Sequence, residues 1–353
     1  MNQIKVLVVD DSMVFRKLLV KSLTRDPSIT VVATATDPYQ ARDAIIKYKP
    51  DVMTLDVELP RMNGIEFLRK LMPQYPIPTV VISSLSDAVF DALSAGAVDF
   101  AAKPQPTDKV EMDAFLNTEL PQKVKIAAMA QINKGKRAIA NAPVTVDAFK
   151  GSLIDQRLIV AIGASTGGTE AIAAVIKEFE PNIPGVVVVQ HMPPGFTQMY
   201  ANRLNNQCRV SVKEAETGDV VRQGHVLIAP GGNRQMRLVK KGDQYQVECR
   251  EGPKVNGHCP SVDVLFDSVA SVAGKYALGI ILTGMGGDGA KGLLKMRQAG
   301  SPTIGQDEST CVVYGMPKVA YELGAVQFQE KLTDIPKRAY NILNKMQRME
   351  DAK

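Results

Sequence analysis

The chain has 353 residues, with 42 Lys and Arg against 37 Asp and Glu, and a formal net charge of +5. This length favours two domains, each large enough to bury its own core, and a mean hydropathy near zero with 22% charged residues excludes a disordered or fibrous chain. The four cysteines form no C-x-x-C pair, no apolar run approaches the ~20 residues of a membrane helix, and no secretory signal is visible, so we expect a cytoplasmic protein without direct membrane insertion.

The small positive excess does not indicate a nucleic-acid partner. Its densest patch is the stretch 134–137, and the remainder is spread along the chain, whereas a nucleic-acid footprint is normally a concentrated stripe on one fold. Aromatic residues make up only 5% of the chain, so side chains on which bases could stack are scarce. We therefore expect no nucleic acid among the partners.

The first third of the chain alternates apolar runs with amphipathic segments. Such alternation predicts βαβ units, in which helices cover both faces of a parallel sheet. The expected strands are 4–9, 31–35, 52–55, 80–82 and 98–102, and the expected helices are 13–23, 38–48, 63–75, 88–95 and 108–128.

A second alternation of the same kind follows a polar segment rich in small residues, which has the composition of a linker. The sequence therefore predicts two doubly wound α/β domains with parallel sheets, spanning 1–125 and 153–353 and joined by a linker over 126–152. In the second domain the expected strands are 157–163, 186–190, 225–229, 278–283 and 325–328, with a hairpin of 236–239 and 246–249 inserted between them.

Carboxylates, a hydroxyl and a lysine follow four of the five predicted strands of the first domain. Asp10 and Asp11 follow the first strand, Asp56 the third, Ser83 the fourth and Lys103 the fifth. The carboxyl ends of parallel strands share one edge, and three carboxylates there would repel one another unless they shared a hard cation, for which Mg²⁺ is the natural candidate. Asp56 is then a candidate phosphoryl acceptor, because the metal, the hydroxyl and the ammonium are each placed to neutralise a phosphoryl oxygen.

These residues, together with the Pro-Arg-Met-Asn-Gly turn at 60–64, resemble the receiver domain of two-component response regulators. The resemblance implies a flavodoxin-like fold and phosphorylation of Asp56 by a partner histidine kinase. It also implies that Mg²⁺ is held by Asp11, Asp56 and the backbone carbonyl of Glu58, with Asp10 in support.

The same resemblance implies a receiver switch that involves Ser83, Lys103 and Phe100. Phe100 stands where the family has an aromatic switch residue coupled to the Ser83 position. Its spacing fits an ordinary core residue of the fifth strand equally well, so both interpretations stay open.

A glycine-rich loop joins the first strand of the second domain to the following helix. A dinucleotide-binding turn would need Gly where Ser165 stands, and the next strand would need to end in an acid, whereas it ends in Gln190 and His191. The alternative is a nucleophile elbow, because Gly163-x-Ser165-x-Gly167 matches G-x-S-x-G between a strand and a helix. The N–H groups at the start of that helix would then face an oxyanion formed beside Ser165.

A serine hydroxyl needs a base within hydrogen-bond reach, and the chain holds three histidines. His191 ends the next strand and is expected at the same edge of the sheet as Ser165. His225 precedes its strand and is expected at the opposite edge, and His258 lies in an irregular stretch from which it could still approach the site. Position alone therefore favours His191 as the base.

An acid that orients this base should come from another strand end on the same edge. Asp288, in the glycine-rich loop after the predicted strand 278–283, is the candidate, although an aspartate there could instead cap the next helix. The chain order Ser, His, Asp differs from the Ser, Asp or Glu, His order of α/β-hydrolases, so the domain is not expected to be one despite its G-x-S-x-G.

The motifs of the second half are Gly-Ala-Ser-Thr-Gly-Gly at 163–168, Gln-His-Met-Pro-Pro-Gly-Phe-Thr at 190–197, Ala-Pro-Gly-Gly at 229–232, Pro-Ser-Val-Asp at 260–263 and Thr-Gly-Met-Gly-Gly-Asp-Gly at 283–289. Together they resemble the chemotaxis protein-glutamate methylesterases, in which a Rossmann-like catalytic domain follows a receiver domain. The resemblance implies hydrolysis of glutamate methyl esters on methyl-accepting chemotaxis receptors, deamidation of receptor glutamines, and no cofactor for the esterase step. It carries over Ser165, His191 and Asp288 as the catalytic triad and Met285 as a neighbour that shapes the active site through its backbone N–H.

Regulation and two alternatives follow from the same organisation. A receiver ahead of a triad domain can cover its active-site edge, and phosphorylation by the chemotaxis histidine kinase would weaken that contact. A receiver fused to a DNA-binding output domain would need a helix-turn-helix with a basic recognition helix, and the glycine-looped second half shows neither. An adaptor with a degenerate triad is disfavoured because all three triad residues are present.

Overall fold

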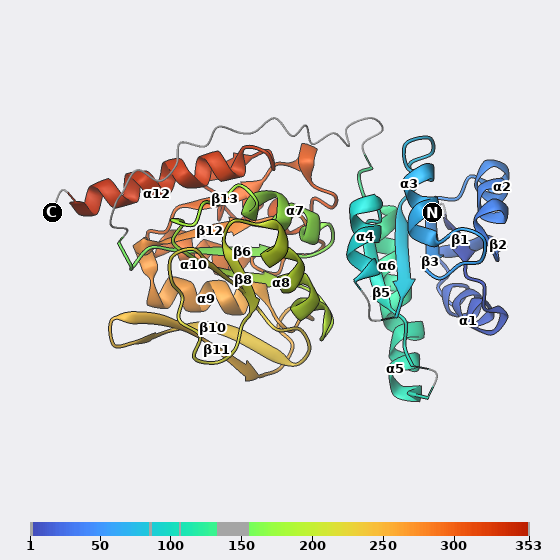
Figure 1. Ribbon diagram of the computed structural model, residues 1–353, viewed down its shortest axis with the longest axis horizontal. Helices are drawn as coiled ribbons and strands as arrows, with labels where there is room; N and C mark the ends of the chain where they lie inside the picture. Colours follow the sequence, from blue (N-terminus) through green and yellow to red (C-terminus); the bar gives the residue numbers. More distant parts are fainter. Residues whose placement is uncertain (1–2, 85–86, 106, 133–154, 352–353) are drawn as a thin grey trace. The chain divides into compact units, whose positions relative to one another are not determined.

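The computed structural model describes residues 3–84, 87–105, 107–132 and 155–351. The chain divides into two compact units, Met1–Ala138 and Ile139–Lys353, and each is described by itself (Figure 1). No helix within the described ranges is long and apolar enough to cross a membrane.

Five parallel strands form the sheet of the first unit, in the order β2-β1-β3-β4-β5. This is the strand order of flavodoxin-like doubly wound folds, which the resemblance to receiver domains implied. The central strands are almost wholly buried, which explains why they carry continuous apolar runs and no alternation of apolar with polar residues. The strands are β1 (Ile4–Val9), β2 (Ile29–Ala35), β3 (Val52–Asp56), β4 (Thr79–Ser83) and β5 (Asp99–Ala102).

Side-chain caps begin the first three helices of this unit. The Ser12 hydroxyl accepts a hydrogen bond from the Phe15 N–H, and the side chains of Asp37 and Asn63 each accept two from the first turns of their helices. The helices are α1 (Met13–Leu23), α2 (Pro38–Tyr48), α3 (Gly64–Leu71), α4 (Ala88–Ala95), α5 (Lys109–Ala114) and α6 (Leu120–Ala128).

Two helices of the first unit differ from the expectation. The predicted helix 63–75 ends at Leu71, because Pro73 disfavours the helical conformation of the residue before it. The predicted helix 108–128 is interrupted by a π-helical segment, Phe115–Glu119, whose wider turn brings the buried Phe115 and Leu120 to the same face. Since α6 extends through Ala128, residues 126–128 of the predicted linker are helical, and 133–152 lie outside the described residues.

The second unit contains a 7-stranded sheet in the order β14-β13-β12-β6-β7-β9-β8, in which all the neighbouring strands are parallel. Figure 1 shows α7 and α12 on one side of this sheet and α9 and α10 on the other, as in a doubly wound, Rossmann-like domain. The strands are β6 (Ile159–Ala164), β7 (Gly185–Gln190), β8 (Ser211–Glu214), β9 (His225–Ile228), β12 (Ala277–Ile281), β13 (Thr303–Gln306) and β14 (Phe328–Glu330). The helices are α7 (Gly168–Ile176), α8 (Phe196–Gln207), α9 (Val262–Val272), α10 (Ala290–Gln298), α11 (Met316–Glu322) and α12 (Ile335–Asp351).

The predicted hairpin is confirmed as β10 (Arg234–Lys241) and β11 (Gln244–Glu251), which pair antiparallel outside the main sheet. Its apolar face, with Met236, Leu238 and Val247, belongs to the same buried cluster as the inner face of α9. The hairpin therefore packs against α9, the next helix along the chain.

Three strands of the second unit differ from the expectation. β8 was not predicted, because it is a short edge strand with one buried residue, and β13 was not, because its apolar run is only a few residues long. The predicted strand 325–328 is wrong for its first three residues. The Ala325 N–H donates to the Ala320 carbonyl and closes the end of α11, so the register with β13 begins at Phe328, after a first hydrogen bond from the Gln327 N–H to the Thr303 carbonyl.

Candidate functional site

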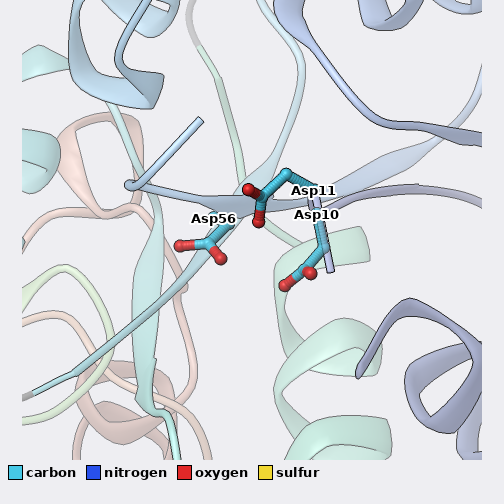
Figure 2. Close-up of side chains that lie close together, drawn as sticks. All are labelled: Asp10, Asp11 and Asp56. Atoms are coloured by element: carbon cyan, nitrogen blue, oxygen red, sulfur yellow. The ribbon is translucent and has the colours of Figure 1, made fainter. Parts of the chain in front are cut away.

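Three carboxylates meet at the carboxyl edge of the first sheet. Asp10 and Asp11 follow β1, and Asp56 is the last residue of β3. Each offers a carboxylate oxygen, and these oxygens lie within 4.8 Å of one another (Figure 2). Asp10 and Asp56 are buried, whereas Asp11 is exposed. The arrangement suits a divalent cation that takes several oxygen ligands and keeps water on its open side.

The Lys103 ammonium lies against two of these carboxylates. Its Nζ donates to Asp56 Oδ2 at 2.6 Å and to Asp10 Oδ2 at 3.2 Å. Burial raises the pKa of Asp10 to about 6, although Lys103 opposes the shift. Burial also acts against the charged form of Lys103, but the hydrogen bonds and charges of Asp56 and Asp10 together outweigh it, and the pKa of Lys103 is raised. Lys103 is therefore a permanent positive charge beside Asp56.

The other residues that the sequence placed at this edge lie close by. Ser83 is the buried last residue of β4, and its carbonyl accepts the Lys103 N–H at 2.7 Å. The Glu58 N–H donates to Asp56 Oδ1 at 3.1 Å. Phe100 is buried in β5, where the Lys123 ammonium lies 5.7 Å from its ring centroid. The switch role of Phe100 stays a prediction.

In the second unit, Ser165 and His191 directly follow two neighbouring parallel strands. β6 ends at Ala164 and β7 at Gln190, and these two residues are partners in the register. The His191 N–H donates to the Ala164 carbonyl at 3.2 Å, and Gln190 Nε2 donates to the carbonyls of both Ser165 and His191, at 2.9 and 3.1 Å. The serine and the histidine are therefore held side by side at the carboxyl edge of the sheet.

The backbone around Ser165 is a tight turn from strand to helix. The Ser165 N–H donates to the Thr283 carbonyl at 3.0 Å, and the Ser165 carbonyl accepts the Gly168 N–H at 2.7 Å. Gly167, at the N-cap of α7, has a φ of 75°, which favours glycine. A Cβ on Gly284 would lie 2.7 Å from the Ser165 Cβ, so only glycine allows the two loops to approach this closely.

The His191 ring is bonded to Asp288. Its Nε2 lies 2.8 Å from Asp288 Oδ2, and the two side chains are 9% and 1% exposed. An ionised carboxylate can only accept, so the neutral imidazole carries its proton on Nε2 and its lone pair on Nδ1. Nδ1 is buried and has no hydrogen-bond partner among the described residues. Nδ1 is thus the ring nitrogen whose lone pair is unused within the described residues.

The Asp288 carboxylate accepts hydrogen bonds from other groups besides His191. Its partners at the start of α9 are the N–H groups of Val262, at 2.7 Å, and Asp263, at 3.2 Å, together with the Ser261 hydroxyl at 2.7 Å. Burial acts to raise the pKa of Asp288, but the hydrogen bond and charge of His191, with the hydrogen bonds of Asn256 and Ser261, hold it well below its usual range.

The alternative in which Asp288 only caps the next helix is wrong. The N-cap of α10 is Gly289, without a side-chain hydrogen bond, and the carboxylate is turned toward α9 and His191.

Met285 lies half-buried in the same loop, one residue after the glycine that touches Ser165. As expected, His225 begins β9 and so lies at the opposite edge of the sheet.

Three further residues surround the His191–Asp288 pair without having been assigned a role from the sequence. Asn256 Nδ2 donates to Asp288 Oδ1 at 2.8 Å, and Ser261 bonds the same oxygen. The His258 ring is stacked on the His191 ring. The Asn-Gly pair at 256–257 is a turn signal that could have indicated a fixed loop, but the contacts of that loop are formed only in the folded chain.

The comparisons with known proteins cover both units. The model of the CheB methylesterase family matches residues 160–339, and that of the response regulator receiver domain matches residues 6–114. A protein-glutamate methylesterase/protein-glutamine glutaminase of Syntrophomonas wolfei is 59% identical over 346 residues, which are 98% of this chain and 99% of the relative. A protein of the same name from Escherichia coli is 49% identical over 330 residues, 92% of this chain and 93% of the relative.

One solved structure resembles the second unit in particular. The crystal structure of the Thermotoga maritima CheB methylesterase catalytic domain is 39% identical, with a TM-score of 0.51, and the match covers 52% of this chain and 98% of that domain. The identities extend over nearly the full length, and the triad candidates lie within the matched region. The chain therefore belongs to the CheB methylesterase family, in the form that carries a response regulator receiver domain.

Proposed function

We propose that this protein is a cytoplasmic, phosphorylation-regulated serine hydrolase that demethylates glutamate methyl esters on methyl-accepting chemotaxis receptors. The observation that carries the proposal is the arrangement at one sheet edge, where Ser165 lies beside His191 and His191 is bonded to the ionised Asp288. The names of the relatives support the choice of substrate, since they are called protein-glutamate methylesterases.

The first chemical step is attack by the serine. His191 Nδ1 takes the hydroxyl proton of Ser165 as its Oγ bonds to the side-chain carbonyl carbon of the glutamate ester. The resulting imidazolium is stabilised by the Asp288 carboxylate on Nε2. The two ring nitrogens thus exchange the parts they have in the chymotrypsin triad, where Nε2 is the base.

The second part of the reaction is collapse of the tetrahedral intermediate. N–H groups at the start of α7 and the Met285 N–H stabilise its oxyanion. The C–O bond to the methoxy group breaks, His191 returns the proton, and methanol leaves. A water molecule, deprotonated by the same nitrogen, then attacks the acyl-enzyme, and the products are the receptor carboxylate and regenerated Ser165.

Glutamine deamidation is a second activity of the same site. An amide carbonyl differs from the ester only in its leaving group, which His191 protonates to release ammonia. The relatives are named protein-glutamine glutaminases as well as methylesterases, which supports this extension.

The test is methanol release from a methylated receptor. We expect the full chain to release methanol from membranes that contain methylesterified receptor, and ammonia from receptor with the unprocessed glutamines. Matched membranes in which the receptor carries no methyl ester serve as the control. If no methanol were released either without a phosphodonor or with one, the proposal would be overturned.

The receiver unit supplies the regulation in this proposal. Asp10, Asp11 and Asp56, with the Glu58 carbonyl, would hold Mg²⁺, and their closely spaced oxygens fit such an ion. Bound there, Mg²⁺ would offset the charge of a phosphoryl group. Asp56 would accept that group from the chemotaxis histidine kinase, while the Lys103 ammonium and the Ser83 hydroxyl each bind one of its oxygens.

Phosphorylation is expected to relieve an inhibition that the receiver imposes on the esterase. A small phosphodonor with Mg²⁺ should raise methanol release by the wild-type chain, and EDTA or the Asp56→Asn variant should abolish the increase. A fragment of residues 152–353 should be more active than the unphosphorylated full chain and indifferent to the phosphodonor. Glu66→Gln, an exposed change on α3, is the matched control and should respond as the wild type does. Equal basal rates of fragment and full chain would refute the inhibition.

A further inference from the structure

A two-residue turn approaches the active site from the stretch between β11 and α9. Val255 and His258 exchange both of their backbone hydrogen bonds, each 2.9 Å long, across Asn256 and Gly257. The φ angles of the two turn residues are 53° and 85°. Such positive values characterise type I′ turns, for which Asn-Gly is the preferred pair. A turn this short fixes the directions in which Asn256 and His258 project.

Asn256 joins two buried carboxylates. Its Nδ2 donates to Asp288 Oδ1 at 2.8 Å and to Asp263 Oδ2 at 2.7 Å. Asp263 is anchored independently, because its other oxygen accepts the Gly292 N–H at 2.6 Å. The amide thus connects Asp288 to a second fixed point, in addition to the start of α9, and the carboxylate cannot rotate without losing these bonds.

His258 covers one face of the His191 ring. The two ring centroids are 3.7 Å apart and the rings are inclined by only 10°. The hydrogen bond from Nε2 to Asp288 fixes one atom of His191, but the last torsion of a histidine side chain has broad minima, so one bond leaves the ring free to tilt. Stacking fixes the ring plane, and both constraints together determine where Nδ1 points.

We propose that Asn256 and His258 are positioning residues for the catalytic base. Asn256 sets the Asp288 carboxylate and His258 sets the plane of His191, so that Nδ1 faces the Ser165 hydroxyl. The proposal rests on the proposed function, in which His191 is that base. Asn256 acts through the Asp288 carboxylate and His258 through the His191 ring, so we expect their loss to change the turnover rate rather than substrate binding.

The kinetic test compares two replacements of His258 in the full chain. His258→Ala removes the stacked ring, and we expect kcat for methanol release from methylated receptor to fall by about 10- to 100-fold, with KM changed less than twofold. His258→Phe keeps a flat ring over His191 and should recover at least half of the loss on a logarithmic scale. His225→Ala, which removes the histidine at the opposite sheet edge, is the control and should leave both constants unchanged.

Asn256→Gly tests the other half of the turn. Glycine accepts the positive φ, so the turn is retained while the amide is lost. We expect a fall in kcat of a similar order, again with little change in KM. A normal kcat in both Asn256→Gly and His258→Ala would overturn the proposal, and so would a rise in KM alone, which would make them substrate contacts.

A spectroscopic readout separates positioning from general destabilisation. The proton on His191 Nε2 should give a low-field ¹H resonance that is sharp in the wild type and in His258→Phe, and broadened or lost in His258→Ala while the remaining spectrum is unchanged. An unaltered resonance in His258→Ala would overturn the proposal. If that variant does not fold, His258→Gln, which lacks a flat ring, replaces it in both measurements. The Ser165→Ala variant tests the proposed function separately. If that function were wrong, Ser165→Ala would keep its activity, whatever the His258 variants show.

Discussion

Ser165→Ala is expected to lower kcat for ester hydrolysis by about five orders of magnitude or more, because the variant has no nucleophile and His191 no proton to remove. The fold should be unaffected. The backbone hydrogen bonds of Ser165 with Thr283, Gly168 and Gln190 do not involve its hydroxyl, and alanine keeps the Cβ against which Gly284 packs. Some acceleration over the uncatalysed reaction should persist through the oxyanion donors.

Methanol release over time from methylated receptor measures this effect. Ser271→Ala is the matched control, because its hydroxyl is exposed and bonds only the Asp267 carbonyl one turn earlier in α9. Its rate should equal that of the wild type. A Ser165→Ala variant that keeps near-normal esterase activity would show that the hydroxyl is not the nucleophile.

Asp288→Asn is expected to have the second largest effect, a loss of about 10⁴-fold in kcat. An amide can donate to His191 Nε2, which would favour the tautomer with the proton on Nδ1, and that nitrogen could then no longer accept the Ser165 proton. The amide also carries no charge to stabilise the imidazolium. The kinetic measurement is the same methanol assay. Asp243→Asn, in the exposed turn of the β10–β11 hairpin, is the control and should be fully active.

The same substitution should destabilise the second unit in a pH-dependent way. Loss of the carboxylate leaves buried donors poorly paired, at a cost of about 2–4 kcal/mol in the free energy of unfolding near neutral pH. Because the folded pKa of Asp288 is depressed, its stabilising contribution is present above the unfolded value of about 3.9 and is lost as the pH falls toward the folded value. Urea unfolding at a series of pH values should therefore show that the difference in free energy of unfolding between wild type and variant becomes smaller below about pH 4. A gap that is constant with pH would mean that the carboxylate charge is not involved.

The two sheet edges differ in how much of their chemistry could be predicted. In the first unit nearly every group ends a buried strand or comes directly after one, and a parallel sheet brings the ends of neighbouring strands together by construction. Asp10, Asp11, Asp56 and Lys103 were expected at one edge for that reason, and the structure brings them there. The same rule placed Ser165 beside His191 and His225 at the far edge.

Prediction was weakest where contacts depend on loops that leave and re-enter the edge. A lone aspartate before a helix looks like an N-cap, and only the folded chain turns Asp288 toward α9 and His191. The strand β13 was missed because its apolar run is short, although burial between two neighbours makes it part of the sheet. The π-helical segment at Phe115 was missed because the helical period of 3.6 carries no information about a locally wider turn.

By itself the sequence determined the two α/β units, the strand ends on which the carboxylates, the serine and the histidine stand, and the family to which these motifs belong. These features are local, since strand periodicity and the residue after a strand are properties of short stretches of chain. The tertiary structure alone decided that the Asn256–His258 turn lies against the His191–Asp288 pair and that, within the described ranges, the Nδ1 of His191 has no hydrogen-bond partner. Those contacts join residues more than thirty positions apart, and they exist only because burial of the hairpin and α9 on the sheet carries the turn to the catalytic edge.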